Sequence, residues 1–310
     1  MLMKCLALGI KWILNIMGFV LAKMPHWLFL WHIKALAWLM RVFDRRRFED
    51  AKANLDFVYG TQMSEERKQA IIKQCYQNFA FVLLESTRVA FIPFEILNSK
   101  FDFVDEHFIL DSLTKDGSAV LISAHYGYWE AMAAVLPPRY HWCNMASLGR
   151  LTPFDAINQM IIARRELQKV KFIDKKGAFK HLLRLYNSKN ALAGILVDQN
   201  ISPDEGVWIE FFGKRATHTT IASVLSRRFG VGVVPVLIGM NENYTRFEVR
   251  YYPPIYCKKS EESNQDILEA TQAQADTIER VIRENPQNWF WFHKRWKSAY
   301  SEIYSQNSTT

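Results

Sequence analysis

The chain has 310 residues, of which 49% are hydrophobic and 23% are charged. That composition argues against a disordered chain and is sufficient for one large core or two small ones. The net charge of +8 favours an acidic partner, such as nucleic acid, an anionic membrane surface, a phosphorylated substrate or an acidic carrier protein.

Two apolar runs open the chain. Residues 5–22 carry one charge, Lys11, and residues 27–40 are rich in tryptophan. A helix needs about 20 apolar residues to span a bilayer, so the first run is borderline, and tryptophan in the second favours the interface. We predict that residues 1–45 anchor the protein to a membrane, as a spanning helix or as interfacial helices. A pair of buried core helices is the alternative.

Basic residues are distributed unevenly around these runs. Only Lys4 precedes the first run, whereas four arginines follow the second: Arg41, Arg45, Arg46 and Arg47. Because positive charge is retained on the cytoplasmic side of a membrane, this asymmetry places the main body on that side. No small-residue cleavage site follows a short apolar core, so the pattern is not that of a secretory signal peptide.

The remainder, residues 46–310, is predicted to form a single α/β domain. A long helix begins after Ser64, a good N-cap, and strand and helix patterns alternate beyond it. Alternation of this kind predicts a largely parallel or mixed sheet flanked by helices. The predicted strands cover residues 118–123, 191–197, 231–239 and 246–252, and the predicted helices cover 64–91, 130–136, 152–167, 176–187 and 264–285.

The stretch "SAHYGYWE", residues 123–130, lies where the first predicted strand ends. Ligands bind at the carboxyl ends of strands in open α/β sheets, so His125 is a candidate site residue. Glu130 falls in the first helical turn or just beyond, where its carboxylate can turn back and orient the imidazole. An imidazole held in this way can take a proton from an alcohol. The alternative is a buried turn that holds two polar residues.

The next buried strand also ends in polar residues, the sequence "DQN" with Asp198 and Gln199. Two strand ends with polar groups predict one shared site, although Asp198 could simply cap a turn. The sequence lacks glycine-rich phosphate loops and the GxSxG motif, which argues against a nucleotide enzyme and a serine hydrolase. The four cysteines lie far apart, so neither a disulfide framework nor a metal site is predicted.

Three further features each allow two interpretations. Arg164 and Arg165 end the predicted helix 152–167, where basic residues are also favoured by the helix dipole. Phe211 and Phe212 lie in a segment that forms either the wall of an apolar groove or plain core. Residues 288–297 mix aromatic and basic side chains, a pattern that suits nucleic acid or lipid headgroups.

Together these segments resemble a known family. "AHYGYWE" looks like the H-x4-D/E block of glycerolipid-type acyltransferases, in its H-[FY]-G-x-W-E form. "DQN", "GVWIEFFGKRAT" and "NPQNWFWFHKRWK" look like further blocks of one branch, the late acyltransferases of lipid A biosynthesis in Gram-negative bacteria, which transfer lauroyl or myristoyl chains. The resemblance runs from the N-terminal apolar segment to about residue 300, and it implies a glycerol-phosphate-acyltransferase-like fold within the lysophospholipid acyltransferase superfamily.

The resemblance also implies a reaction. The donor would be a thioester of acyl carrier protein, the acceptor a hydroxyl of a lipid A precursor of the Kdo-lipid IVA type, and no cofactor would be needed. The alternative acceptors are another glycolipid or a lysophospholipid. The enzyme would work at the inner membrane on the cytoplasmic side, with that anionic membrane, the carrier protein and the precursor as partners and no nucleic acid.

Site residues follow from the same resemblance. His125 and Glu130 match the catalytic pair, with His125 as general base in a direct transfer. Tyr128 departs from the pattern, because many members carry a small polar residue there. The remaining assignments are substrate-binding Arg164, Arg165, Asp198 and Gln199, of which Arg165 stands nine residues before Asp174, and an acyl groove formed by Trp129, Phe211 and Phe212. The competing class, a non-catalytic membrane or nucleic-acid binder, would depend on Arg295 and Lys297 instead.

Overall fold

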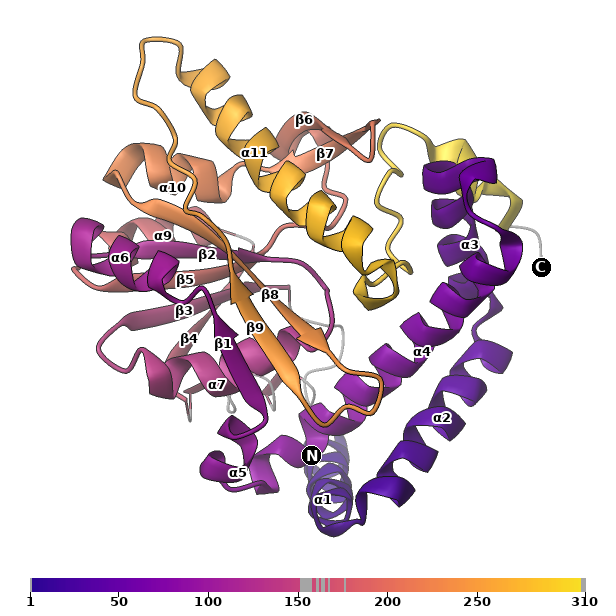
Figure 1. The fold of residues 1–310 in the computed structure, drawn as a ribbon. Coiled ribbons are helices and arrows are strands. Elements are labelled where there is room, and N and C mark those ends of the chain that lie inside the picture. The colour runs from indigo at the N-terminus through magenta and orange to yellow at the C-terminus, as the bar shows by residue number, and fades with distance from the viewer. Residues whose placement is uncertain are drawn as a thin grey trace.

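The fold is described from a computed structural model, which covers residues 2–150, 158, 159, 162, 165, 166, 168–175 and 177–307. Arg164 and most of the predicted helix 152–167 lie outside these residues. The described part is an α/β structure with a mixed, mostly parallel sheet flanked by helices, which confirms the α/β part of the predicted fold class (Figure 1).

A seven-stranded sheet, in the order β1-β9-β8-β2-β5-β3-β4, forms the centre of the described structure. Neighbouring strands are parallel except for β8 and β9, which are antiparallel. β2 and β8 are fully or largely buried, as expected for apolar strands covered on both faces. The strands are β1 (Phe101–Val104), β2 (Ala119–Ser123), β3 (Asn144–Gly149), β4 (Val170–Asp174), β5 (Ala191–Leu196), β8 (Gly232–Met240) and β9 (Phe247–Tyr251).

A hairpin and ten α-helices make up the rest of the described regular structure, apart from short 3-10 turns. The hairpin pairs β6 (Gly206–Phe211) with β7 (Lys214–Thr219). Helix α11 runs beside β8 in Figure 1, while α2, α3 and α4 form a separate layer at the side of the sheet. The helices are α1 (Leu2–Lys23), α2 (His26–Phe43), α3 (Arg45–Tyr59), α4 (Glu65–Arg88), α5 (Phe94–Asn98), α6 (His107–Asp116), α7 (Met132–Arg139), α9 (Ala178–Tyr186), α10 (Ile221–Phe229) and α11 (Ser263–Glu284).

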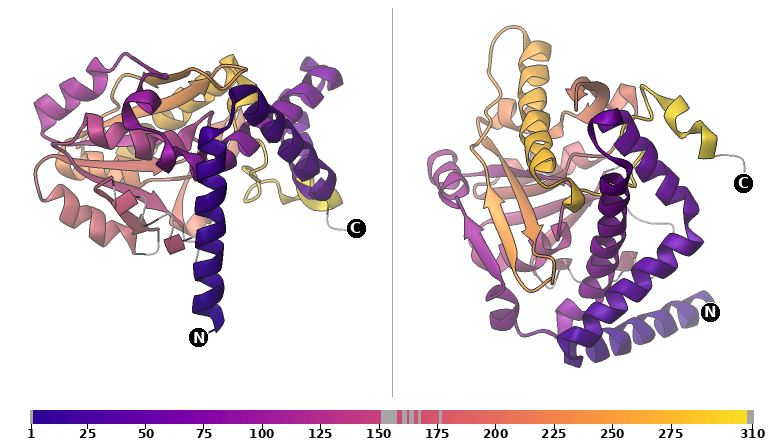
Figure 2. Two further views of the ribbon diagram at one scale, coloured as in Figure 1. Left: turned by 90° about the horizontal axis from the view of Figure 1, so that it is seen from below. Right: turned by 45° about the vertical axis from the view of Figure 1, so that its right-hand side comes forward.

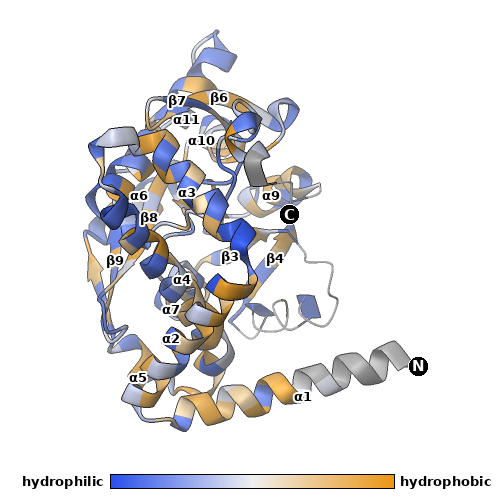
Figure 3. Ribbon diagram, turned by 90° about the vertical axis from the view of Figure 1, so that its right-hand side faces the viewer, coloured by the Kyte–Doolittle hydropathy of each residue, from blue (hydrophilic) through white to orange (hydrophobic). Residues whose placement is uncertain are grey.

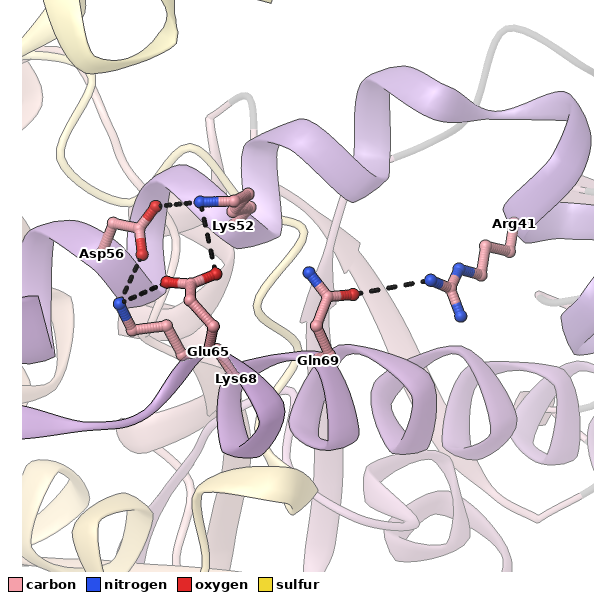
Figure 4. A network of polar contacts seen from close by, with 6 residues as sticks. All are labelled: Arg41, Lys52, Asp56, Glu65, Lys68 and Gln69. Carbon is pink, nitrogen blue, oxygen red and sulfur yellow. Dashed lines mark hydrogen bonds and ion pairs between the residues drawn. The ribbon is translucent and has the colours of Figure 1, made fainter.

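Helix α4 begins as predicted, because the Ser64 side chain accepts a hydrogen bond from the backbone N–H of Arg67. Lys68, near its start, bonds Asp56 of α3 at 2.6 Å and Glu65 at 3.0 Å. Lys52 bonds the other oxygen of Asp56 at 2.6 Å (Figure 4). This network joins α3 to α4, and α4 in turn supports the C-terminal segment described below.

Helices α1 and α2 contain the two apolar runs. Phe29, Ile33 and Ala37 recur every fourth residue of α2 and are buried, whereas its outer side exposes Trp27 and Trp38. Helix α1 extends away from the rest of the molecule (Figure 2, left), and its described part is largely apolar (Figure 3). The exposed large apolar side chains of α1 are Trp12, Ile13, Ile16, Phe19 and Val20.

The prediction that a helix within residues 1–45 spans the membrane is not supported. Among the described residues, no helix combines the length and the apolarity needed to cross a membrane. The predicted transmembrane helix is therefore not supported, because the hydropathy of these helices falls short of what a span requires.

Candidate functional site

His125 lies two residues beyond β2, at the carboxyl edge of the sheet, as its sequence position predicts. The chain turns there through Gly127, whose φ is +54° and whose missing side chain lets the backbone of β8 approach. A Cβ atom at this position would lie 1.9 Å from the carbonyl oxygen of Ile238. That oxygen accepts a hydrogen bond from the N–H of Tyr128 at 3.1 Å, which fixes the turn beside His125.

Asp198 is the carboxylate that holds the imidazole. Its Oδ1 lies 2.8 Å from Nδ1 of His125, and its Oδ2 accepts hydrogen bonds from the His125 N–H at 2.9 Å and from the Trp289 indole N–H at 2.8 Å. The Asp198 side chain is fully buried, whereas that of His125 is 14% exposed. Since Nδ1 donates to a carboxylate, Nε2 is the unprotonated nitrogen and is left for a substrate.

Asp198 stays ionised in this environment. Burial by itself would raise the pKa of its carboxyl, but the charge and hydrogen bond of His125 outweigh burial and lower the pKa below its ordinary value. His293 and Trp289 act in the same direction. A buried carboxylate bonded to Nδ1 orients the ring and stabilises the imidazolium that forms when Nε2 takes a proton.

The expected contact between Glu130 and the imidazole is replaced by a different pairing. Glu130 lies within a 3-10 turn, Trp129–Ala131, and its Oε2 accepts a hydrogen bond from Nη2 of Arg165 at 2.9 Å. The order of the strands explains this pairing. Because β2 and β5 are parallel neighbours, Asp198, two residues beyond the end of β5, lies next to His125, two residues beyond the end of β2. Glu130 and Arg165 instead form an ion pair of their own.

The side chain of Gln199 lies between His125 and Lys175. Its amide nitrogen lies 3.5 Å from Nε2 of His125, and its amide oxygen accepts a hydrogen bond from Lys175 at 3.1 Å. Burial lowers the pKa of Lys175. Arg295 donates to the backbone carbonyl of Gln199 at 3.3 Å and so helps to fix the turn after β5.

The C-terminal segment, residues 288–297, packs directly against the turn that carries His125. The N–H of Phe290 donates to the carbonyl of His125 at 2.9 Å, and the N–H of Gly127 donates to the carbonyl of Asn288 at 2.8 Å. The His293 ring lies 4.6 Å from the His125 ring, edge to face. The sequence pattern did not single out His293, because alternating aromatic and basic residues pointed to a surface patch.

Most of that segment is core rather than surface, although Lys297 is exposed. Trp289, Trp291 and Trp296 are fully buried, and Arg295 is buried too, donating to the carbonyl of Thr217. Arg295 is thus enclosed and cannot reach the phosphates of a nucleic acid. The mixture of aromatic and basic residues that suited a nucleic-acid binder is therefore explained by packing in the core, where Arg295 and the tryptophans are buried.

Phe211 and Phe212 belong to the same core. Phe212 stacks on Trp289 at 6.3 Å, and Phe211 lies edge-on to that ring at 5.8 Å. Neither side chain is among the residues that line the apolar cavity beside the site, so their place in an acyl groove stays a prediction. Tyr128 is also a core residue, packed on Phe81 and Phe247.

An apolar cavity of about 80 Å³ lies beside the carboxyl edge of the sheet, the edge that carries His125. Trp129 lies between the cavity and His125, because it lines the cavity and its ring lies 5.3 Å from the His125 ring. Glu130 and Arg165 also line it, together with apolar residues of β2, β3, β5 and α7. Of the three predicted groove residues, Trp129 is thus the one that meets this cavity.

His125, Asp198 and His293 bring three possible metal-binding atoms within 4.8 Å of one another. However, the two oxygens of Asp198 already accept three hydrogen bonds. The hydrogen bonds therefore favour a base held by a carboxylate over a set of metal ligands.

Comparison with known proteins shows the family of the chain. A family model described as bacterial lipid A biosynthesis acyltransferase matches residues 2–298, nearly the whole chain. No curated protein matches the chain. The match includes β2, β5 and the C-terminal segment, whose residues converge around His125. The chain therefore belongs to the family of bacterial lipid A biosynthesis acyltransferases.

Proposed function

We propose that the protein transfers a fatty acyl chain from the thioester of acyl carrier protein to a hydroxyl of a lipid A precursor of the Kdo-lipid IVA type. Family membership establishes an acyltransferase of lipid A biosynthesis. The observation that supports this reaction best is the His125–Asp198 pair beside an apolar cavity. It places a general base for a hydroxyl beside an apolar cavity, the environment that a hydrocarbon chain prefers.

The proposed mechanism is direct transfer. Nε2 of His125 takes the proton of the acceptor hydroxyl as that oxygen bonds to the thioester carbonyl carbon. The tetrahedral intermediate then collapses, the carbon–sulfur bond breaks, and the carrier thiolate takes the proton back from the imidazolium. Asp198 stabilises the imidazolium throughout.

Arg165 is the proposed donor to the oxyanion. Its Nη2 is held by Glu130, but its buried Nε has no hydrogen-bond partner among the described residues. Because a buried N–H is costly when unpaired, this atom is ready to bond an oxygen that enters with the substrate. Gln199, beside Nε2 of His125, is a second donor of the right kind.

The described cysteines favour a mechanism without a covalent intermediate. Burial raises the pKa of Cys75 to about 12 and that of Cys143 to about 11, and it also raises the pKa of Cys257. Thiols in this state are weak nucleophiles, because the thiolate is the reactive form. The base therefore acts on the acceptor rather than on a thiol of these three.

We propose that α1 and α2 attach the protein to the cytoplasmic face of the inner membrane. Exposed tryptophans, among them Trp12, Trp27 and Trp38, suit the bilayer interface, and the arginines that follow suit anionic lipid. Replacing Trp27 and Trp38 with serine is expected to lower binding to vesicles that contain phosphatidylglycerol, measured by co-flotation. Unchanged flotation would contradict this attachment.

The transfer itself is tested with purified protein, radiolabelled acyl-carrier-protein thioester and a Kdo-lipid IVA acceptor. We expect label in the acceptor lipid and, in rapid-quench samples without acceptor, no label on the protein. A stoichiometric burst of labelled protein would contradict direct transfer. If the label reaches no acceptor from any thioester donor, the proposed reaction itself is wrong.

A further inference from the structure

Gly194 lies in the middle of β5, one of the central strands of the sheet. A glycine inside a strand is unfavourable, because it loses more entropy on folding and packs no side chain. Its backbone does not need glycine, since its φ is outside the left-handed region. Its surroundings do not need it either, because an added Cβ would meet nothing closer than the Ala146 carbonyl oxygen at 3.9 Å.

The missing side chain opens onto the apolar cavity. Gly194 pairs in register with Leu121 of β2 and Ser147 of β3, and all three residues line the cavity. Residues paired across a sheet share a face, so these three form one row across the cavity wall.

Along the strand direction, one row of residues that line the cavity lies on each side of the row of Gly194. Two residues nearer the carboxyl edge of the sheet, Ser123 pairs with Leu196, and both line the cavity. Two residues deeper, Met145 pairs with Val170, and both line it as well. Each step of two residues is about 6.6 Å, so the row of Gly194 lies halfway between the row of Ser123, nearest His125, and the deepest row, that of Met145.

We propose that Gly194 is a specificity-determining residue, which keeps this cavity open so that the donor acyl chain passes from the carboxyl edge of the sheet to the row of Met145 and Val170. The inference rests on the proposed function and adds the determinant of chain length. A side chain at position 194 would shorten the space available to the hydrocarbon, so donors of shorter chain would be preferred.

The expected effect scales with the atoms added. Burial of one methylene contributes about 0.8 kcal/mol, which is about fourfold in binding. Gly194→Ala should therefore weaken long donors about fourfold, and Gly194→Val, which adds three carbons, should weaken them at least tenfold. Shorter donors should keep nearly wild-type rates. Valine favours strand structure, so the variant is expected to fold.

The experiment measures kcat/KM for a series of saturated acyl-carrier-protein donors, from short to long, with wild type and both variants. Gly239 supplies the matched control, because it is also a strand glycine with open space at its Cβ position, and it does not line the cavity. We expect Gly194→Val to move the optimum to shorter chains and Gly239→Val to leave it in place. An unchanged optimum, or an equal loss at all lengths, would overturn the inference.

Binding of free fatty acids separates this inference from the proposed reaction. Tritiated fatty acids of the same lengths are titrated into wild type and Gly194→Val, with thermal unfolding as a check of the fold. If no thioester supports transfer, the proposed reaction fails, yet a selective loss of long fatty acids in Gly194→Val still supports the inference. Equal binding of all lengths by wild type and variant, or no binding by either, would contradict it.

Discussion

Replacing Asp198 with asparagine is expected to lower kcat for acyl transfer by roughly 10³- to 10⁴-fold, the range set by a reversed imidazole tautomer. Oδ2 of Asp198 faces two N–H donors, those of the His125 backbone and the Trp289 indole. An asparagine must place its carbonyl oxygen there, because its NH2 group would oppose both donors. The NH2 group then faces Nδ1 of His125, which must accept, so the ring proton moves to Nε2.

That tautomer cannot act as the base. With Nε2 protonated, no lone pair is left at the nitrogen that faces the acceptor hydroxyl. The size and shape of the residue are conserved, and thermal unfolding should show a folded protein. KM for the donor should stay near wild type, because Asp198 does not line the acyl cavity.

Glu130→Gln is the matched comparison. Glu130 bonds Arg165 and lines the cavity, so this change should raise KM for the donor as well as lower kcat. If Asp198→Asn keeps more than a tenth of wild-type kcat while Glu130→Gln abolishes turnover with KM unchanged, Glu130 and not Asp198 supports the base.

Replacing His125 with alanine is expected to reduce turnover by about 100-fold or more, the usual effect of losing a general base. No described neighbour is suited to take over. Burial is the main cause that lowers the pKa of His293, and it remains after His125 is removed, so the His293 ring still binds a proton poorly. Glu130 is engaged with Arg165. Loss of His125 therefore leaves the acceptor hydroxyl without a base.

Two controls separate this role from a structural one. His181→Ala removes an exposed histidine of α9 and should leave turnover unchanged. Added imidazole should partly restore His125→Ala, because the truncated side chain leaves space at the partly exposed site. A folded His125→Ala protein with near-normal rates would show that another group is the base.

The sequence was informative where a strand is continuously apolar. β2, β5 and β8 were predicted to within about one residue, because runs such as "SAVLIS" and "ALAGILV" can only be buried. β3 and β4 were missed, since "NMASLG" and "VKFID" mix polar and apolar residues. Their pairing comes from neighbouring strands, which a local pattern does not contain.

The candidate site divides in the same way. Position at a strand end identified His125 and Asp198, but strand order decides which carboxylate meets the imidazole, and order is a property of the whole sheet. The short spacing between His125 and Glu130 along the sequence instead suggested Glu130 as the carboxylate that orients the imidazole. Phe211 and Phe212 were assigned to a groove because an aromatic pair fits a lipid wall and a core equally well. Their contact with Trp289 spans many residues and leaves no local signature.

Mass spectrometry of lipid A tests the central claim most directly. The comparison uses the source bacterium without this gene, complemented with the wild-type chain or with His125→Ala. We predict that the deletion strain lacks one secondary acyl chain, that the wild-type chain restores it, and that His125→Ala does not. Lipid A of unchanged mass in the deletion strain, or full restoration by His125→Ala, would contradict an acyltransferase of lipid A biosynthesis that works through this histidine.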